Sequence, residues 1–232
     1  RQRFGLPCGG TMKLILEPMA DLAEVDALIE AINSRQIISR RLDLITGEVS
    51  SQVTTAQATS ELITKDETAA EWINIFGPRH QLIVIGAGQT SEYLANMALA
   101  LEYNIHIIDP RPEYHQHWPI AGVQLHTQYP DDAIVKIGID SRTAVVALTH
   151  DLKLDDLALI AALKSDAFYI GALGSAKTTD NRKQRLRQHF GFCDADLDKL
   201  HGPVGFKIGS KTPPEIALSV LAEITAVKNK TI

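Results

Sequence analysis

The residues best suited to chemistry stand in small clusters, each after a short apolar run. The first cluster, GAGQT, follows the run LIVI and precedes a helical pattern. Its first glycine permits a tight turn, and its second lets backbone N–H groups approach a phosphate at the start of a helix. Ser91 stands where the dinucleotide-binding fingerprint has a third glycine, so we expect looser helix packing but an intact anion cradle. The candidate ligand-binding residues of this loop are Gly86, Gly88 and Gln89.

A second cluster, DPR, ends the next apolar run. Asp109 occupies the place where an acid usually binds the hydroxyl pair of a ribose, and Arg111 adds a cation two residues on. The glycines alone could form a turn without a ligand. The combination with an apolar strand, a helix and such an acid favours nucleotide binding.

The third cluster, THD, comprises Thr149, His150 and Asp151. Its histidine and aspartate could perform acid–base chemistry, orient a ligand or bind a metal. Asp151 could equally cap the helix that follows it. We expect this loop to contact the ligand.

The fourth cluster, GALGS, is a second glycine-rich turn between a strand and a helix and is typical of a second anion-binding nest. Lys177 lies in the first helical turn, where the dipole disfavours a cation, and a bound anion would relieve that conflict. A solvated lysine balanced by Asp180 is the alternative. The candidates here and before the last helix are Gly171, Gly174, Ser175, Lys177, Lys211 and Thr212.

The remaining candidates stand alone. Cys8 lies between Pro7 and two glycines, so we expect an accessible thiol whose pKa nearby N–H groups could lower, whereas Cys193 has no comparable setting. The HQH motif at 115–117 has the spacing of metal ligands but no accompanying carboxylate or cysteine cluster, which favours an ordinary loop. Of the basic residues at 182–187, Arg182 is the one expected to turn toward the site, the others forming a solvated face.

Bulk composition narrows the class of protein. The chain has 232 residues and 45% apolar content, which supports a substantial core. Its 23 basic and 28 acidic residues give a net charge of −5, which argues against a nucleic-acid partner. No apolar run is long enough to span a bilayer, and two distant cysteines favour a reducing cytoplasm over a disulfide scaffold. Without a methionine start or a signal-like region, the chain is read as a fragment lacking its own beginning.

The elements that must position these clusters fall into two domains, 1–78 and 79–232. For the first, the patterns predict a strand, a helix begun at Asp21, a hairpin and a short strand, at 11–18, 21–33, 37–53 and 71–76. The segment 55–70 is polar and weakly periodic. We therefore expect a smaller, incomplete α+β domain that precedes the main one.

The second domain alternates short apolar strands with helices, as in a Rossmann-like α/β fold with a doubly wound parallel sheet. Its strands are predicted at 82–86, 104–109, 123–127, 143–150 and 167–173. Its helices are predicted at about 87–103, 153–165 and 177–189. The last helix is predicted to begin at Thr212-Pro213-Pro214-Glu215, with Thr212 as the N-cap, Pro213 as the first helical residue and Glu215 as the capping partner. Because ligands bind at the carboxyl ends of such strands, the four loops and the segment 209–212 should line one crevice.

Taken together, six stretches resemble the XdhC/CoxI family of xanthine dehydrogenase accessory proteins over nearly the whole chain. They are LPCGG, IGAGQTSEYLA, HIIDPRPEY, ALTHDLKLDD, FYIGALGSAKT and HGPVGFKIGSKTPPEIALSVLAEI. The resemblance implies a chaperone that binds the molybdenum cofactor (molybdopterin) and protects it during sulfuration by a cysteine desulfurase. It also implies insertion of that cofactor into the apoenzyme of a xanthine dehydrogenase-type molybdenum hydroxylase. The family's cysteine before two glycines corresponds to Cys8, a candidate ligand to the molybdenum.

Other readings stay open beside the resemblance. An NAD(P)-dependent oxidoreductase would use the same Rossmann-like half, with His150 or Lys153 as proton donor. A nucleotide-sensing or scaffold module would bind without chemistry. The resemblance favours a cofactor-insertion protein over an enzyme, and a homodimer is compatible with it.

Overall fold

A computed structural model describes residues 15–17, 22–55, 60–66, 69–116 and 118–232 of the chain. It divides into two compact units, residues 1–77 and 78–232, so that the boundary falls within the Gly77-Pro78 pair. Within the described ranges, no helix combines the length and the apolarity that crossing a bilayer would require.

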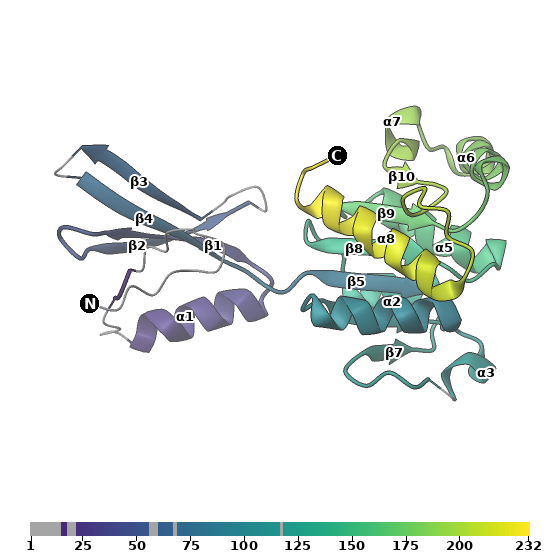
Figure 1. The fold of residues 1–232 in the computed structure, drawn as a ribbon, viewed down its shortest axis with the longest axis horizontal. Coiled ribbons are helices and arrows are strands. Elements are labelled where there is room, and N and C mark those ends of the chain that lie inside the picture. Colours follow the sequence, from purple (N-terminus) through teal and green to yellow (C-terminus); the bar gives the residue numbers. More distant parts are fainter. Residues whose placement is uncertain (1–14, 18–21, 56–59, 67–68, 117) are drawn as a thin grey trace. The chain divides into compact units, whose positions relative to one another are not determined.

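The first unit has one helix, α1 (Leu22–Asn33), within its described residues, and an antiparallel sheet in the order β2-β1-β4-β3. The strands are β1 (Ile37–Asp43), β2 (Val49–Thr54), β3 (Glu61–Asp66) and β4 (Ala69–Phe76). The predicted hairpin is confirmed, because β1 pairs with β2 in a register that places Ile37 opposite Thr54 and Leu42 opposite Val49. The α+β class of this unit is confirmed as well (Figure 1).

Two expectations for this unit were wrong. Residues 15–17 of the strand predicted at 11–18 are not in a strand, and the rest of that segment lies outside the described residues. The polar segment 55–70 contains β3, which was not predicted. β3 is hydrogen-bonded to β4. Residues 61–66 form a strand because of this pairing, and their own sequence lacks the apolar pattern that would have predicted one.

The second unit is a six-stranded, wholly parallel sheet in the order β7-β6-β5-β8-β9-β10, the arrangement of a doubly wound Rossmann fold. Its strands are β5 (Gln81–Ile85), β6 (Asn104–Ile108), β7 (Gln124–His126), β8 (Thr143–Ala147), β9 (Tyr169–Ala172) and β10 (Leu200–His201). β5 and β8 are buried along their whole length, as expected for strands covered on both faces. The predicted fold class is confirmed.

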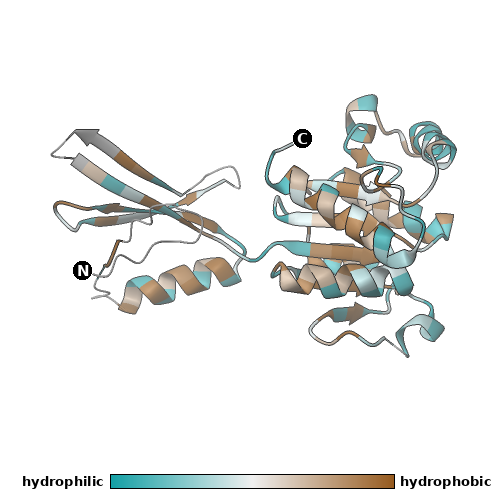
Figure 2. Ribbon diagram, viewed as in Figure 1, coloured by the Kyte–Doolittle hydropathy of each residue, from teal (hydrophilic) through white to brown (hydrophobic). Residues whose placement is uncertain are grey.

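Helices cover both faces of this sheet. α2 (Gln89–Ala100) and α8 (Pro213–Lys228) pack on one face, where Leu94 and Val220 are fully buried (Figure 1). α4 (Pro130–Ile137), α5 (Leu152–Leu163) and α6 (Ala176–Phe190) pack on the other. Figure 2 shows the apolar strands between these layers and the largely hydrophilic α6. The short helices α3 (Pro112–His115) and α7 (Asp194–Leu197) complete the unit.

The expected strands and long helices of this unit are present with ends that differ by a few residues. α4 was not predicted, although Pro130, Ala133, Ile134 and the partly buried Ile137 have the spacing of one helix face. The carboxyl ends of all six strands meet at one edge of the sheet. The loops that leave β5 and β8 at that edge diverge onto opposite faces, which opens a space between them.

Candidate functional site: a crevice at the switch point of the parallel sheet

A pocket of about 260 Å³ lies at the point where the strand order reverses. It is lined by the first turn of α2, by the loops after β6 and β8, and by the first residue of α8. The lining residues are Gly88, Gln89, Thr90, Ser91, Arg111, Tyr114, Leu148, Thr149, His150 and Pro213. The expectation that the first, second and third clusters would come together is thus met by residues from each.

The glycine-rich turn is shaped by close contact with the loop after β8. Gly86 has φ of +104°, and a Cβ there would lie 3.0 Å from both Cα and Cγ2 of Thr149. Gly88 caps α2 with extended backbone (φ −87°, ψ 178°), and a Cβ there would meet nothing within 4 Å. The first glycine is therefore required by packing and conformation. The second leaves open space in front of the unpaired N–H groups of the first helical turn.

Ser91, in the third-glycine position, fits the helix–strand contact. Ser91 is 1% exposed, and its Oγ has no hydrogen-bond partner within the described residues. The serine is thus accommodated in a buried position, and the looser helix packing stays a prediction. A buried hydroxyl without a partner costs about 1–3 kcal/mol, so its position in the wall of a pocket is a feature to explain.

Asp109 holds the glycine-rich turn and Arg111 together. Its carboxylate is fully buried and accepts hydrogen bonds from the Ala87 N–H (2.9 Å) and the Arg111 N–H (3.1 Å). It also accepts from Arg111 Nε (2.8 Å) and Nη2 (2.7 Å). Although burial raises the pKa of Asp109, these hydrogen bonds hold it below its usual range. In this arrangement the acid positions the turn and the guanidinium.

The Arg111 guanidinium forms a wall of the pocket. Its carbon lies 4.0 Å from the centre of the Tyr114 ring, a cation–π contact, and the hydrogen bond to Asp109 raises its pKa. The guanidinium is therefore held on an edge by Asp109 and on a face by Tyr114. His115, from the HQH motif, contacts the Asp109 carbonyl oxygen; His117 lies outside the described residues. Within the described ranges, no three potential metal ligands gather in one place.

The THD loop forms the wall between this pocket and a wider one of about 690 Å³. His150 lines both pockets, is exposed, and has φ of +63°, a conformation that few residues with a side chain adopt. Asp151 caps α5 by accepting from the N–H groups of Lys153 (2.9 Å) and Leu154 (3.4 Å). The capping alternative for Asp151 is thus confirmed, and Asp151 also lines the wider pocket.

Beneath this loop lies a buried charge network. Arg182 is 1% exposed and forms ion pairs with Asp155 and Asp156, each at 3.2 Å, and donates to the Leu173 carbonyl oxygen. Arg182 therefore does turn inward, but toward the acids of α5 rather than into the pocket. Arg185 also pairs with Asp156, at 2.6 Å, so the basic run is less of a solvated face than expected.

The GALGS loop lies at the same edge of the sheet but lines neither of the two pockets. Gly171 belongs to β9, where a Cβ would lie 2.6 Å from Val204 Cγ2. Ser175 caps α6 by accepting from the Thr178 N–H at 3.1 Å, and Lys177 is exposed. A ligand role for Gly171, Gly174, Ser175 and Lys177 stays a prediction.

Pro213, the first residue of α8, lines the pocket, whereas residues 209–212, which were expected to line the crevice, line neither of these two pockets. Glu215 accepts from the N–H groups of Lys211 (2.8 Å) and Thr212 (2.9 Å), which confirms the expected capping role of Glu215. Lys211 and Thr212 are exposed beside this cap. Their part in binding stays a prediction.

Glu223 of α8 contacts both ends of the HGPVG motif at 201–205. Glu223 accepts from the Tyr169 hydroxyl (2.5 Å) and the Gly205 N–H (2.8 Å), and His201 Nδ1 lies 3.3 Å from its other oxygen. The Tyr169 and His201 rings stack with centroids 4.5 Å apart. This cluster joins β9, β10 and α8 and so supports the edge of the sheet without lining the crevice.

Sequence reasoning missed two residues of the site. Tyr114 lines both pockets, and its signal was its place three residues after Arg111 behind a helix-starting proline. Asp155 accepts from the Thr149 N–H (3.2 Å) and hydroxyl (2.7 Å) and so sets the course of the THD loop. An acid in the first turn of a helix is ordinarily explained by its favourable interaction with the helix dipole, so the sequence did not indicate this role for Asp155.

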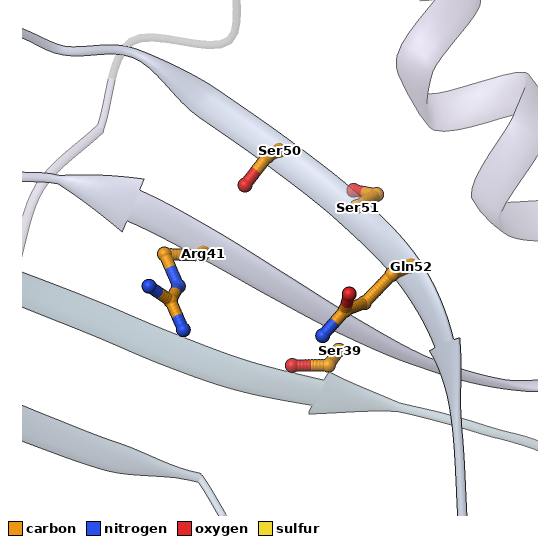
Figure 3. A pocket seen from close by; sticks show the side chains of 5 residues that line it. All are labelled: Ser39, Arg41, Ser50, Ser51 and Gln52. Atoms are coloured by element: carbon orange, nitrogen blue, oxygen red, sulfur yellow. The ribbon is translucent and has the colours of Figure 1, made fainter.

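The first unit has a pocket of its own, of about 320 Å³, on the polar face of its sheet (Figure 3). The register places Ser39 opposite Gln52 and Arg41 opposite Ser50, so their side chains share that face. Arg41 pairs with Glu71 at 3.2 Å, which neutralises the only charge among these four residues. Cys8, the candidate thiol and molybdenum ligand, lies outside the described residues.

Comparison with known proteins identifies relatives of this chain. Residues 82–224 match the XdhC Rossmann domain. The chain is 28% identical over 229 residues to the molybdenum cofactor insertion chaperone PaoD of Escherichia coli, covering 96% of this chain and 61% of that protein. It is 32% identical over 167 residues to a Bacillus subtilis protein named as a probable xanthine dehydrogenase subunit, covering 71% of this chain and 48% of that protein.

A solved structure shares the fold. The crystal structure of a xanthine dehydrogenase from Bacillus halodurans superposes with a TM-score of 0.73 at 23% identity, covering 90% of this chain and 68% of that chain. The chain thus spans less than two thirds of the length of the curated relatives named above. Since the family model covers more than half of the chain, the resemblance drawn from its motifs is confirmed: the chain belongs to the XdhC family.

Proposed function

We propose that this chain binds the molybdenum cofactor in the crevice of its second unit and delivers it to a molybdenum hydroxylase. The observation that carries the proposal is the pocket at the switch point, which is lined by both the first turn of α2 and Arg111. A relative named a molybdenum cofactor insertion chaperone supports the identity of the cargo. The relative named as a probable xanthine dehydrogenase subunit supports the class of target.

The residues of the crevice fit such a cargo. The cofactor presents a phosphate, a flat hydrogen-bonding ring system and an anionic metal–dithiolene group. The N–H groups of Gln89 and Thr90 and the Arg111 guanidinium are donors for an anion, and Gly88 leaves space in front of them. The unpartnered Ser91 hydroxyl is a further polar group in the same wall.

The wider pocket suits the ring system. His150, Asp151 and Lys153 offer donors and acceptors for its edge, and Tyr114 offers an aromatic surface beside them. His150 is held outward by a backbone conformation that is costly by about 1–3 kcal/mol for a residue with a side chain, and such conformations concentrate at ligand sites. These residues bind and orient the cargo; the reactivity of the metal is the cargo's own.

Two finer parts of the function are also proposed. Sulfuration takes place while the chain holds the cofactor, with a cysteine desulfurase as the sulfur donor and Cys8 as the candidate thiol for this chemistry. Transfer then occurs to the apoenzyme of a xanthine dehydrogenase-type hydroxylase, with the crevice open to solvent as the exit. A homodimer is compatible with this arrangement.

The test is to purify the full-length protein from cells that make the cofactor and to oxidise the bound material. A fluorescent pterin product in near-stoichiometric amount is expected. The same preparation should raise the activity of cofactor-free target enzyme severalfold over free cofactor. A preparation that copurifies with no pterin and fails to activate any molybdenum hydroxylase would refute the proposal.

A further inference from the structure

We infer that the crevice holds its ligand by a phosphate placed between Arg111 and the first turn of α2, and that Asp109 does not serve as a ribose acceptor. The ligand class is therefore a phosphate ester of a heterocycle, not a nicotinamide dinucleotide gripped by its ribose. The heterocycle's identity as a pterin rests on the proposed function. The phosphate subsite does not.

The Asp109 carboxylate has no acceptor capacity left for a ribose. A carboxylate has about four lone-pair directions, and all four here face a protein donor: Ala87 N–H, Arg111 N–H, Nε and Nη2. The residue is also fully buried. A ribose hydroxyl pair would have to displace the Arg111 side chain to reach it. The acid that the sequence pattern assigns to a ribose is thus already used.

One edge of the Arg111 guanidinium is left for a ligand. Nε and Nη2 point at Asp109 and the face lies on Tyr114, whereas Nη1 has no hydrogen bond within the described part of the chain. The side chain is 25% exposed and lines both pockets. A guanidinium fixed on one edge and one face presents its last donors in a set direction, which suits a phosphate oxygen.

The start of α2 forms another wall of the pocket. The N–H groups of a first helical turn have no acceptor within their own helix, and the positive end of the helix dipole lies at the pocket. Ser91 is 1% exposed, lines this pocket, and its Oγ has no partner. A bound phosphate oxygen would supply an acceptor for this hydroxyl. The serine in place of the third glycine is then part of the subsite.

The two pockets are large enough for one extended ligand. The pocket of about 260 Å³ has room for a phosphate or a pyrophosphate, and the adjoining one of about 690 Å³ has room for a fused heterocycle. Arg111, Tyr114, Thr149 and His150 line both, so one ligand can extend from the first to the second. The phosphate can be the terminal group of a pterin cofactor or part of a pyrophosphate in its nucleotide form.

The experiment titrates the full chain with inorganic pyrophosphate and with NAD⁺ by calorimetry. Wild type should bind NAD⁺ no more tightly than pyrophosphate, because the ribose adds no contact at Asp109. Arg111→Gln should weaken pyrophosphate at least tenfold and shift the preference tenfold toward NAD⁺. Arg187→Gln, an exposed arginine paired with Asp194 on another part of the unit, is the matched control and should change neither.

Ser91→Ala keeps the binding test independent of any unfolding caused by the arginine variant. It should raise the melting temperature of the unliganded protein, since it removes a buried hydroxyl without a partner, and weaken pyrophosphate severalfold. A parallel titration with inorganic monophosphate distinguishes a subsite for a terminal phosphate from one for a pyrophosphate. Tenfold tighter NAD⁺ than pyrophosphate in wild type, or unchanged pyrophosphate in Arg111→Gln, would overturn the inference. Normal copurification of pterin beside such a result would leave the proposed function standing.

Discussion

The buried carboxylate of Asp155 accepts two hydrogen bonds from one residue, Thr149: one from its backbone N–H at 3.2 Å and one from its hydroxyl at 2.7 Å. Thr149 in turn meets Gly86 across the switch point. Asp155 also pairs with Arg182 from α6. One acid therefore links the two loops that form the crevice to a helix that packs on the face of the sheet.

Removing that acid should loosen the crevice. Asp155→Ala leaves the buried Arg182 with one carboxylate fewer and Thr149 without its acceptor, so the free energy of unfolding should fall by about 3 kcal/mol. Chemical denaturation of the full chain measures this. Asp180→Ala, which removes an exposed acid of α6, should change it by less than about 0.5 kcal/mol. Equal effects of the two substitutions would contradict the linking role.

Gly88→Asp should separate ligand binding from folding. Gly88 caps α2 in extended backbone with open space around it, and aspartate is a favoured cap, so stability should be retained or rise by a few tenths of a kcal/mol. The new carboxylate would occupy the N–H groups that a phosphate needs, and pyrophosphate affinity should fall at least tenfold. Gly88→Ala, which places a Cβ in the same space without a charge, should weaken pyrophosphate less than the aspartate does. Undiminished affinity in the aspartate variant would exclude the first turn of α2 as the anion site.

Gly86→Ala should instead damage the fold. Its φ of +104° is unfavourable for a residue with a side chain, and the added Cβ would press on Thr149 at 3.0 Å. We expect a loss of about 2 kcal/mol of unfolding free energy, seen as a lower melting temperature. A variant as stable as wild type would show that the turn relaxes at no cost. Gly88→Ala serves again as the control, because nothing lies within 4 Å of its Cβ.

The Glu223 cluster should give the stability a specific pH dependence. Burial raises the pKa of Glu223, but hydrogen bonds from His201, Tyr169 and the Gly205 N–H hold it below the ordinary value of 4.5. A carboxyl whose folded pKa is depressed stabilises the protein above its unfolded pKa, and that stability is lost as pH falls through the folded pKa.

Glu223→Gln should therefore lower the unfolding free energy by about 2 kcal/mol at pH 7, and the difference from wild type should shrink below pH 4.5. Unfolding curves between about pH 3 and 8, on the pH scale of ordinary carboxyl titration, test this. Tyr169→Phe removes one donor and keeps the acid, so its smaller loss should follow the same trend. A difference that stays constant down to about pH 3 would contradict the assignment.

The two cysteines should differ in function. Cys8→Ser in the full-length protein should leave the fold intact and impair cofactor retention or target activation, since it replaces the thiol that can form a thiolate. Cys193 is exposed, and its Sγ contacts Asp196 at the start of α7; serine there should cap that helix equally well and leave activity unchanged. The measurement is active target enzyme formed per mole of protein. Equal activation by the Cys8 variant and wild type would make LPCGG a structural turn.

Several features were determined by the sequence alone. The apolar runs at 82–86 and 143–148, the GxG turn and the Thr-Pro-Pro-Glu start of the last helix each carry their signal within a few residues. Strand burial, turn conformation and helix capping depend on neighbours along the chain, so these local patterns predicted the Rossmann-like unit and the edge at which its loops meet. The motifs in those loops also indicated the family.

Only the tertiary structure decided which polar groups neutralise one another. Asp109 reads as a ribose acceptor in sequence, but the fold places Ala87 and the Arg111 side chain on its oxygens. Arg182 reads as a surface or ligand-binding cation, but packing of α6 on α5 buries it against Asp155 and Asp156. Some of these pairings join residues that are far apart in the chain, and others depend on the direction in which a side chain points. Their energy depends on distance and desolvation, which no spacing along the sequence specifies.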